Sequence, residues 1–288
     1  GEDVPNYLGF RDELPVPLPE GYDYDGCNAE ILLEQSRVEN GRIMFKSGMS
    51  YRVLLLPKTT TMSLQLLTRI QELVKAGAVV VGPRPQSAPG LRDYPRQDQQ
   101  VRAIAAEVWG DCDGVAVKEH RHGQGRVIWG RAFPEILAAL KVRPDFDYDR
   151  GSERLPISYI HRQVGETEIY FVANPRKEPV TVHARFRVQG KIPQLYLPDS
   201  GEVIRIAGYQ THGDVVEVPL QLDPAGSVFV VFAPGPAQRP VTAVTGGPWP
   251  QVTRDAAGVL VGEFSAAGSY QVALSDGSRQ TVTVTTPA

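Results

Sequence analysis

Two short stretches decide the fold class: Ser50-Tyr-Arg-Val-Leu-Leu-Leu-Pro57 and Ala78-Val-Val-Val-Gly-Pro-Arg-Pro85. Both are almost wholly apolar, which is typical of strands buried on both faces of a parallel sheet. Between them, Ser63 can cap a helix and Gly77 can end it. The apolar face of this helix would consist of Leu66, Leu67, Ile70, Leu73 and Val74. The pattern predicts a strand–helix–strand unit with a right-handed crossover.

The expected strands, Tyr51–Leu56 and Ala78–Val81, indicate a doubly wound α/β sheet of the flavodoxin-like or class I glutamine amidotransferase-like kind. In such sheets the functional groups gather in the loops after the carboxyl ends of the strands. Here those loops read Pro57-Lys-Thr-Thr-Thr61 and Gly82-Pro-Arg-Pro85, without cysteine, histidine or carboxylate. The sequence therefore predicts a fold common among enzymes, but with no catalytic group at these two strand ends.

Further elements are expected around this unit. Asn28 can cap a short helix, Gly41–Phe45 is a strand candidate, and Asp98 can cap a helix. The buried stripe of that helix would be Val101, Ile104, Ala105 and Val108. Gly123–Gly130 predicts a turn into a strand, and Pro134 suits the first turn of a closing helix. No buried strand is evident before Asn28, so we expect the chain to start inside a domain whose first strand lies outside it.

From about residue 155 the pattern changes to short strands separated by turn residues, which predicts an antiparallel β-sandwich. The expected strands are Ser158–His161, Glu168–Ala173, Val180–Val188, Gln194–Leu197, Val203–Ile206, Val215–Val218 and Val228–Phe232. Pro234–Pro240 has the composition of a stiff linker. The strand candidates after it are Val259–Phe264, Ser269–Ala273 and Thr281–Val284, too few for a second sandwich.

We therefore expect three parts: an α/β domain over residues 1–150, a β-sandwich over 151–235, and a linker with a partial β segment over 236–288. A chain of 288 residues with 42% hydrophobic and 22% charged residues is ordinary for a globular protein of more than one domain. The net charge of -3 gives no reason to expect nucleic acid or an anionic membrane as a partner. No apolar run approaches the ~18 residues of a membrane span.

The two cysteines are Cys27 and Cys112. Cys27, in Asp25-Gly-Cys-Asn28, superficially resembles a nucleophile on a glycine-flanked turn, a geometry that lowers the pKa of a thiol. However, no strand precedes it, and Cys112 lies in a polar turn. Spacing alone cannot place the two residues within bonding range. A disulfide therefore stays open beside the simpler interpretation of two buried free thiols.

His120 and His122 form the closest histidine pair, and the acidic residues near them in sequence are Asp111, Asp113 and Glu119. A metal site needs further ligands that converge, so a solvated loop is the simpler interpretation. The other histidines lie in or beside expected strands, where surface or edge positions are expected; these are His161, His183 and His212.

Three acidic sets suggest Ca²⁺ or sugar chemistry. The run Asp145-Phe-Asp-Tyr-Asp149, with its carboxylates at Asp145, Asp147 and Asp149, resembles part of an EF-hand loop, but its sixth position is Arg150 and its twelfth is Pro156. A charged linker between domains is the simpler interpretation. A second set consists of Asp23, Asp25 and Glu30. Glu2 and Asp3 could border a sugar site, but cleavage needs two carboxylates that face one bond.

Aromatic side chains could stack on sugar rings if several shared a face, although packing within the protein is the simpler interpretation. The residues concerned are Trp109, Trp129, Tyr159, Tyr170, Tyr196, Tyr209 and Trp249. Gly123-Gln-Gly-Arg126 lacks the lysine and the following helix of a phosphate loop. From the residues alone we assign no catalytic, cofactor-binding or metal-binding residue in this chain.

A colinear series of motifs resembles the family 106 glycoside hydrolases, the α-L-rhamnosidases. The motifs are Gly1-Glu-Asp-Val-Pro5, Gly21–Asp25 with Asn28-Ala-Glu30, Ser47–Arg52, Leu55-Leu-Pro57, Val80–Pro85, Tyr94-Pro95, Gly123–Gly130, Ile160-His-Arg162 and Tyr170-Phe-Val172. The resemblance covers about residues 1–235 and is weak beyond residue 240.

The resemblance implies an enzyme that removes terminal α-L-rhamnose with inversion, using two carboxylates and usually Ca²⁺ on an N-terminal (β/α)₈ barrel. The matching region follows that barrel, and no residue here matches its catalytic carboxylates. We therefore expect an accessory, non-catalytic portion without a cofactor of its own. Its partner would be the barrel, in a periplasmic or secreted enzyme. The alternatives are a carbohydrate-binding unit that uses aromatic residues of the β domains, and a Cys27-dependent amidotransferase or peptidase.

Overall fold

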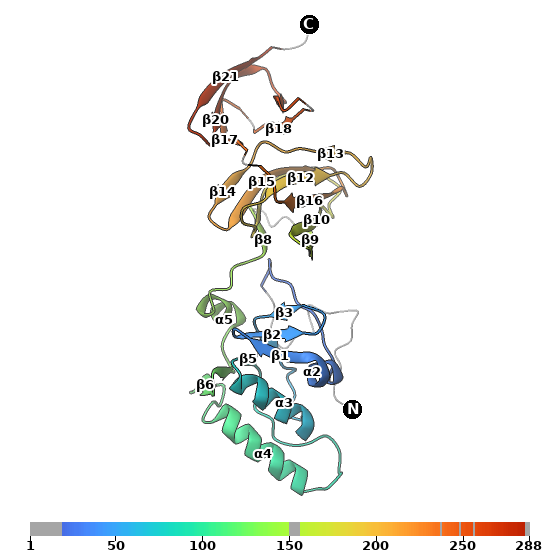
Figure 1. Ribbon diagram of the computed structural model, residues 1–288, viewed down its shortest axis with the longest axis vertical. Coiled ribbons are helices and arrows are strands. Elements are labelled where there is room, and N and C mark those ends of the chain that lie inside the picture. The colour runs from blue at the N-terminus through green and yellow to red at the C-terminus, as the bar shows by residue number, and fades with distance from the viewer. Residues whose placement is uncertain (1–18, 150–155, 237, 248, 256, 286–288) are drawn as a thin grey trace. The chain divides into compact units, whose positions relative to one another are not determined.

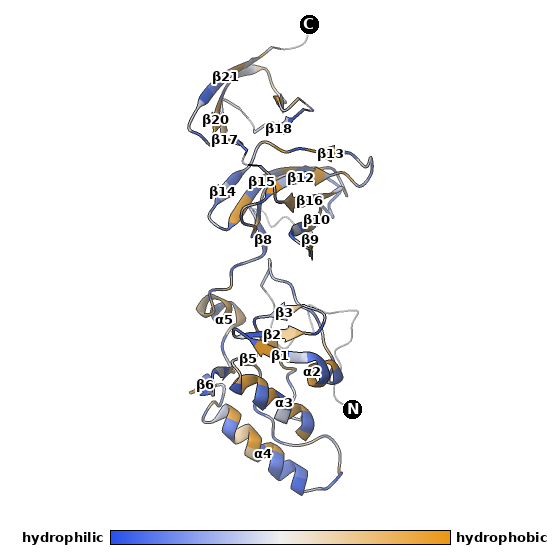
Figure 2. Cartoon of the chain, in the orientation of Figure 1, coloured by the Kyte–Doolittle hydropathy of each residue, from blue (hydrophilic) through white to orange (hydrophobic). Residues whose placement is uncertain are grey.

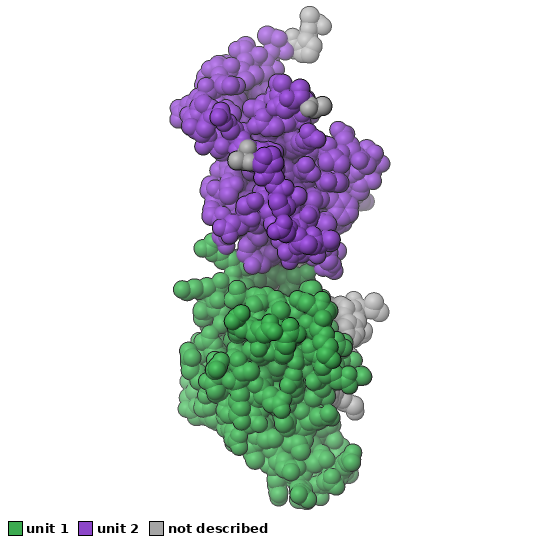
Figure 3. Space-filling view, viewed as in Figure 1, with its two compact units in different colours: residues 1–143 green, residues 144–288 purple. Residues whose placement is uncertain are grey.

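The structure is a computed structural model, and it describes residues 19–149, 156–236, 238–247, 249–255 and 257–285. The protein is mostly β, with few helices and several separate sheets (Figure 1). The chain divides into two compact units, residues 1–143 and residues 144–288 (Figure 3).

The first unit contains a four-stranded sheet of order β4-β5-β7-β6. Its strands are β4 (Leu54–Leu55), β5 (Val79–Val81), β6 (Glu119–His122) and β7 (Gly125–Ile128). β4, β5 and β7 run parallel, and β6 joins the edge antiparallel to β7. Helix α3 (Leu64–Lys75) connects β4 to β5, so the strand–helix–strand unit expected from the sequence is confirmed.

Helix α3 follows its sequence pattern closely. The Ser63 side chain accepts a hydrogen bond from the Leu66 amide at 3.4 Å, and Gly77 continues the chain with φ of +120°. The buried residues are Leu67, Ile70, Leu73 and Val74. Each such side chain contributes about 1.5–3 kcal/mol when it is fully buried. Packing of this face therefore stabilises the helix more than residue propensity does.

Helices cover both faces of the parallel sheet. Val80 packs in one cluster with α3 and α4 (Arg96–Trp109), while Val79 and Val81 pack in another with α5 (Phe133–Ala139). The alternation follows from the two-residue repeat of a strand. All three valines are buried, which explains the continuous apolar run in the sequence.

Asp98 lies in the first turn of α4 and does not cap it as expected. The N-cap residue is Pro95, and no side chain bonds to the helix start there. Asp98 instead accepts a hydrogen bond from the Ala88 amide at 2.9 Å, which fixes the preceding loop.

The predicted single strand Tyr51–Leu56 is wrong, because two sheets share this stretch. β3 (Ser50–Tyr51) pairs with β2 (Arg42–Phe45), which pairs with β1 (Ser36–Glu39). Only β4 joins the parallel sheet. Arg52 lies between β3 and β4 and is exposed, since a charged side chain is costly to bury between two helical layers. Helix α2 (Ala29–Gln35) precedes β1 and is capped by Asn28, as predicted.

The second unit contains two antiparallel sheets, of orders β13-β12-β16-β10-β9 and β14-β15-β11-β8. The strands are β8 (Phe146–Tyr148), β9 (Ser158–Val164), β10 (Thr167–Ala173), β11 (Val180–Phe186), β12 (Ile192–Tyr196), β13 (Val203–Ile204), β14 (Gln210–His212), β15 (Val215–Leu222) and β16 (Ser227–Ala233). Inward side chains of both sheets form one core, with Tyr170, Phe186 and Phe232 fully buried. This is the antiparallel sandwich that the series of short strands separated by turn residues predicts.

A smaller β part follows the sandwich. Its strands are β17 (Val241–Thr245), β18 (Gln251–Arg254), β19 (Leu260–Glu263), β20 (Gly268–Leu274) and β21 (Arg279–Val284). They form a three-stranded sheet, β17-β20-β21, and a β18-β19 hairpin. Ala207 joins this part to the sandwich, because its amide donates to the Val252 carbonyl at 2.9 Å and its carbonyl accepts from the Val241 amide at 2.7 Å.

Strand β8 belongs to the second unit, so the boundary between the two units lies before this strand and not at the expected residue 150. It pairs with β11 through Tyr148↔Ala184 and Phe146↔Phe186, so it belongs to the sandwich. The charged linker predicted over Asp145–Asp149 is therefore wrong, and the second unit begins at Pro144. The expected absence of a first strand concerns the residues before Asn28, of which 1–18 lie outside the described residues.

Candidate functional site

The loops at the carboxyl ends of β4 and β5 are tied to one another by backbone contacts. The Gln86 amide donates to the Thr60 carbonyl at 2.7 Å, and the Met62 amide donates to the Ser87 carbonyl at 3.0 Å. The buried Trp109 indole donates to the Gly82 carbonyl at 3.1 Å. At these strand ends, where an enzyme of this fold class carries its functional groups, the polar groups of the loops therefore hold the fold together.

Cys27 and Cys112 are both free thiols, and only Cys112 is buried. The expectation that both are buried is therefore wrong for Cys27. Desolvation raises the pKa of the Cys112 thiol, although neighbouring backbone hydrogen bonds oppose this effect. Protein atoms around the Cys27 thiol also raise its pKa by desolvation, although the residue as a whole is exposed. A raised pKa reduces the thiolate fraction, whereas a nucleophile needs a lowered one. Near Cys27, Tyr51 donates to Asp25 at 2.5 Å, which engages one carboxylate of the set Asp23, Asp25 and Glu30.

His120 and His122 lie on edge strand β6, not in the loop expected for them. The His120 Nδ1 atom lies 3.4 Å from an Asp111 carboxylate oxygen. Burial and, less strongly, Lys75 lower the pKa of His122. Asp113 accepts hydrogen bonds from three following backbone amides, at 2.8–2.9 Å, and these lower the pKa of its carboxyl group. The candidate ligands thus have separate partners and do not converge.

The structure brings together one cluster of ionisable side chains that the sequence analysis had separated. His161 on β9 lies between Asp145 and Glu168, with Nδ1 2.8 Å from Asp145 Oδ2 and Nε2 3.1 Å from Glu168 Oε2. Asp145 also accepts from Tyr170 at 3.2 Å and from Arg187 at 2.9 Å. Lys191 donates to Glu168 at 2.7 Å and completes the network. These six residues form the charge network: Asp145, His161, Glu168, Tyr170, Arg187 and Lys191.

Strand register places the members of the network. His161 and Tyr170 are directly opposite each other on β9 and β10, and their rings stack with centroids 3.9 Å apart. Asp145 immediately precedes β8, the edge strand of the other sheet. The network therefore joins the two edge strands β8 and β9 and closes one side of the sandwich.

Electrostatics explain why this network is stable as a set of ions. Burial alone would lower the pKa of His161, but Asp145 and Glu168 outweigh that effect and raise the pKa. Burial, followed by the charge of Asp145, raises the pKa of Tyr170, which stays a neutral donor. Each carboxylate accepts from at least two groups. The chemistry of this arrangement is mutual charge compensation, as in other buried ion pairs.

The remaining candidates lie at the surface or in the core. Asp147 and Asp149 both bind Arg185, at 2.9 Å each, and His183 lies 3.1 Å from Glu217. His212 is exposed and contacts Gln210 at 3.1 Å. Of the aromatic residues considered for sugar stacking, Trp109, Tyr170 and Tyr209 are buried, Trp129, Tyr159 and Trp249 are half-buried, and Tyr196 is exposed. Glu2 and Asp3 lie outside the described residues.

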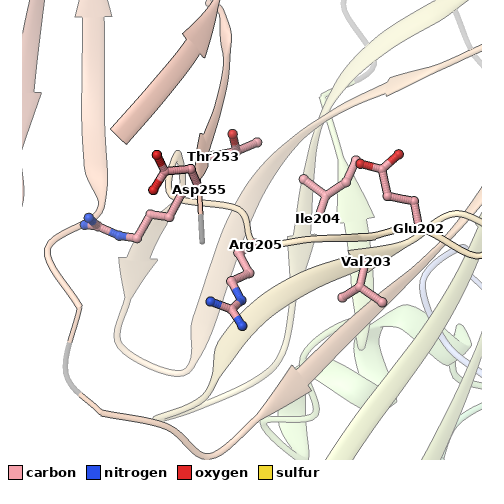
Figure 4. A pocket seen from close by; sticks show the side chains of 7 residues that line it. Glu202, Val203, Ile204, Arg205, Thr253 and Asp255 are labelled. Atoms are coloured by element: carbon pink, nitrogen blue, oxygen red, sulfur yellow. The ribbon is translucent and has the colours of Figure 1, made fainter. Parts of the chain in front are cut away.

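A shallow cavity of about 330 Å³ lies between the sandwich and the smaller β part. Its lining residues are Glu202, Val203, Ile204, Arg205, Thr253, Arg254 and Asp255. Figure 4 shows that the side chains of Glu202 and Arg205 point apart. Specific small-molecule sites have polar groups that converge on the ligand, which this cavity does not show.

Within the part of the chain that the structure describes, no group of three or more His, Cys, Asp or Glu side chains is arranged to hold a metal ion. No helix within the same residues is long and apolar enough to cross a membrane. The charge network is thus the most concentrated set of ionisable groups we find, and sequence reasoning missed it. The hairpin Val164-Gly-Glu-Thr167 was the available signal, because pairing about it places His161 opposite Tyr170.

Comparison with known proteins identifies relatives for most of the chain. A protein of Formosa agariphila named "Putative beta-glucuronidase" is 35% identical over 235 residues, which are 81% of this chain and 18% of that protein. The structure of a rhamnosidase from Novosphingobium sp. PP1Y matches with a TM-score of 0.67 and 28% identity, over 88% of this chain and 26% of that one. This chain thus spans about a quarter or less of each relative's length.

The family model for α-L-rhamnosidase, glycoside hydrolase family 106, matches residues 1–211. That match covers both the parallel-sheet unit and most of the sandwich strands. The chain therefore belongs to the family 106 glycoside hydrolases, the α-L-rhamnosidase family.

Proposed function

We propose that this chain is an accessory, non-catalytic portion of an α-L-rhamnosidase whose active site lies in a barrel outside residues 1–288. Membership of the family supports the reaction class, and the chain spans only 26% of the rhamnosidase structure that it matches. The parent enzyme would remove terminal α-L-rhamnosyl residues with inversion, outside the cytoplasm. Any Ca²⁺ would be held by the barrel, which is also the partner of this chain.

The state of the carboxylates is the observation that carries this proposal. Glycosidases place two carboxyl groups on either side of one bond, about 5–10 Å apart, with one available as acid. Asp145 and Glu168 instead bind the same imidazole and also Arg187 and Lys191. No room for a sugar lies between them, and their role is to hold the sandwich together.

We further infer that the parallel sheet is a doubly wound, amidotransferase-like sheet that serves as scaffold. Its support is the β4–α3–β5 crossover and the helices on both faces. The two strand-end loops carry threonine, serine and backbone groups that bond to one another. A scaffold role explains why a fold that is common among enzymes carries no cysteine, histidine or carboxylate in the loops after β4 and β5.

Hydrolysis of an aryl α-L-rhamnoside tests the accessory role. The chain alone should give no turnover, and clear turnover that survives repurification would contradict the proposal. Calorimetry with rhamnose-containing oligosaccharides tests the carbohydrate-binding alternative, for which micromolar binding is the supporting result. A Cys27→Ser variant addresses the amidotransferase idea, and we expect it to behave as the unchanged chain does.

A further inference from the structure

The two outward faces of the sandwich differ in chemistry. On the four-stranded sheet, register aligns Asp147, Arg185, Glu217 and Gln210 in one row across all the strands. Arg185 and Asp147 form an ion pair at 2.9 Å within this row. Such a polar row is typical of an antiparallel sheet that faces water.

The five-stranded sheet shows the opposite pattern. Register aligns Ile160, Phe171, Phe229, Tyr196 and Val203 in one row from β9 to β13. Residues directly opposite in antiparallel strands point to the same face, so this row is a continuous apolar stripe. The Phe171 and Phe229 rings contact each other with centroids 4.9 Å apart. Ile160 is 50% exposed, Val203 46% and Tyr196 39%.

A second row widens this stripe. Ile169 and Val231 are paired in the neighbouring register, between Arg162 and Gln194 at its two ends. None of these outward residues belongs to the sandwich core, which the alternate positions of the same strands fill. Figure 2 colours these strands by hydropathy, and its orange includes the inward core residues as well as the outward ones. We call these seven residues the outer apolar face: Ile160, Ile169, Phe171, Tyr196, Val203, Phe229 and Val231.

The size of the outer apolar face indicates the kind of partner. Five strands about 4.8 Å apart span about 19 Å, and the two rows lie about 7 Å apart along the strands, so with the width of the side chains the face covers about 200 Å². A stable complex between separate proteins buries about 800 Å² on each partner, about four times as much. Interfaces between domains of one chain begin at about 600 Å² in total, about 300 Å² a side. The area of the face is therefore closer to that of a contact with a neighbouring domain of the same polypeptide than to that of a complex with a second copy.

The chemistry of the face disfavours a glycan. The Phe171 and Phe229 rings are inclined at 53°, so they do not form one flat platform for successive sugars. Apart from the Tyr196 hydroxyl, the side chains of the face have no group that can bond to sugar hydroxyls. Carbohydrate sites need such groups beside their aromatic rings, whereas the core of a protein interface is apolar and dry.

We propose that the outer apolar face is the surface against which the catalytic portion of the rhamnosidase polypeptide packs. This inference rests on the proposed accessory function and adds the place of contact. It accounts for an apolar face with Ile160, Tyr196 and Val203 exposed, opposite a polar face on the same sandwich. The matched relatives extend well beyond the region equivalent to this chain, and so contain polypeptide that could cover it.

Hydroxyl-radical footprinting of Tyr196 and Phe229 tests the proposal. The oxidation rates of both residues are compared between this chain alone and the longer polypeptide that also contains the barrel. We expect both rates to fall at least about fivefold in the longer polypeptide, because interface cores exclude water. If the chain alone shows no turnover and the two oxidation rates do not differ between the chain and the longer polypeptide, the docking surface is wrong and the accessory function still stands. Turnover by the chain alone would instead overturn the accessory function.

A pair of double variants separates docking from folding. Ile160→Lys with Val203→Lys places charges on the outer apolar face, and Gln210→Lys with Gln221→Lys places them on the polar face of the same sandwich. In the longer polypeptide, the first pair should raise the oxidation rates of Tyr196 and Phe229 toward those of the chain alone, because charges disfavour a dry interface core. The second pair should leave both rates as low as in the unchanged polypeptide. Protection of Tyr196 that depends on the concentration of the chain alone, or on added rhamnose oligosaccharide, would overturn the proposal in favour of self-association or sugar binding.

Discussion

Asp145 is the only charged residue among the described ones that is classed as buried, at 9% exposure. Three donors surround its carboxylate: the His161 ring, the Tyr170 hydroxyl and the Arg187 guanidinium. Hydrogen bonds to an ionised group contribute about 1.5–3 kcal/mol each, and removal of one partner leaves the other uncompensated. At this scale the stability of the sandwich depends on the protonation of one imidazole.

We predict that His161 makes the stability of the second unit depend on pH. Its pKa is raised in the folded state, so the stabilisation is complete below the unfolded value of about 6.5 and is lost as pH rises through the folded pKa. His161→Gln should lower the free energy of unfolding by about 2 kcal/mol at pH 6 and by less at pH 9. Urea denaturation followed by circular dichroism measures this difference. His212→Gln, on the exposed strand β14, is the control, and an equal loss at both pH values for His161→Gln would contradict the assignment.

At the scale of elements, the close approach of two loop backbones, at Gly114 and Gly130, fixes the position of the sheet in addition to side-chain packing. Gly130 follows β7 with φ of +75°, and a Cβ atom there would lie 1.8 Å from the Gly114 carbonyl oxygen. Because backbone atoms are involved, neither loop can yield without moving β7 or the turn before β6. The sheet and the helix α5 that follows are thus held by a contact that only glycine permits.

Gly130→Ala should therefore destabilise the first unit by more than about 3 kcal/mol. Gly48 is the matched control in the same unit, because its φ is +90° and a Cβ atom there would meet nothing within 4 Å. Gly48→Ala carries only the backbone strain, about 1–2 kcal/mol. Thermal denaturation of the two variants separates the contributions. Similar melting temperatures for the two variants would show that the loops adjust freely, and that the close approach to Gly114 is not the reason for glycine at position 130.

Elements with a clear period could be predicted, and those set by pairing could not. Leu67 to Val74 repeat at helical spacing, and Val228 to Phe232 form a short run of β-branched and aromatic residues, so α3 and β16 follow from local pattern. The expected strand over Tyr51–Leu56 is divided because Arg52 lies outside both sheets. The apolar residues around Arg52 gave no sign of this division. Phe146–Tyr148 became a strand through partners almost forty residues away on β11. The charge network was missed for the same reason, since Asp145 and His161 come from different sheets and meet only after both sheets have formed.

On the scale of the whole molecule, each unit contains complete hydrophobic clusters of its own. The clusters around α3, α4 and α5 use residues up to Val142, and the sandwich cluster begins at Phe146. Every strand pair also lies within one unit. A segment with its own core and its own paired strands has what a domain needs to fold by itself.

Residues 144–288 should therefore fold without residues 1–143. The isolated segment is expected to show a β-type circular dichroism spectrum and a cooperative thermal transition, because its 18-residue buried cluster draws on that segment alone. Asp145→Asn weakens the network inside the segment and should lower its melting temperature by several degrees, since each kcal/mol lost shifts the melting temperature of a domain of about this size by about 2–4 °C. Asp199→Asn, in the exposed turn after β12, is the control and should not. A segment that stays unfolded at all temperatures would show that the sandwich requires the first unit, and that the clusters seen here are not sufficient.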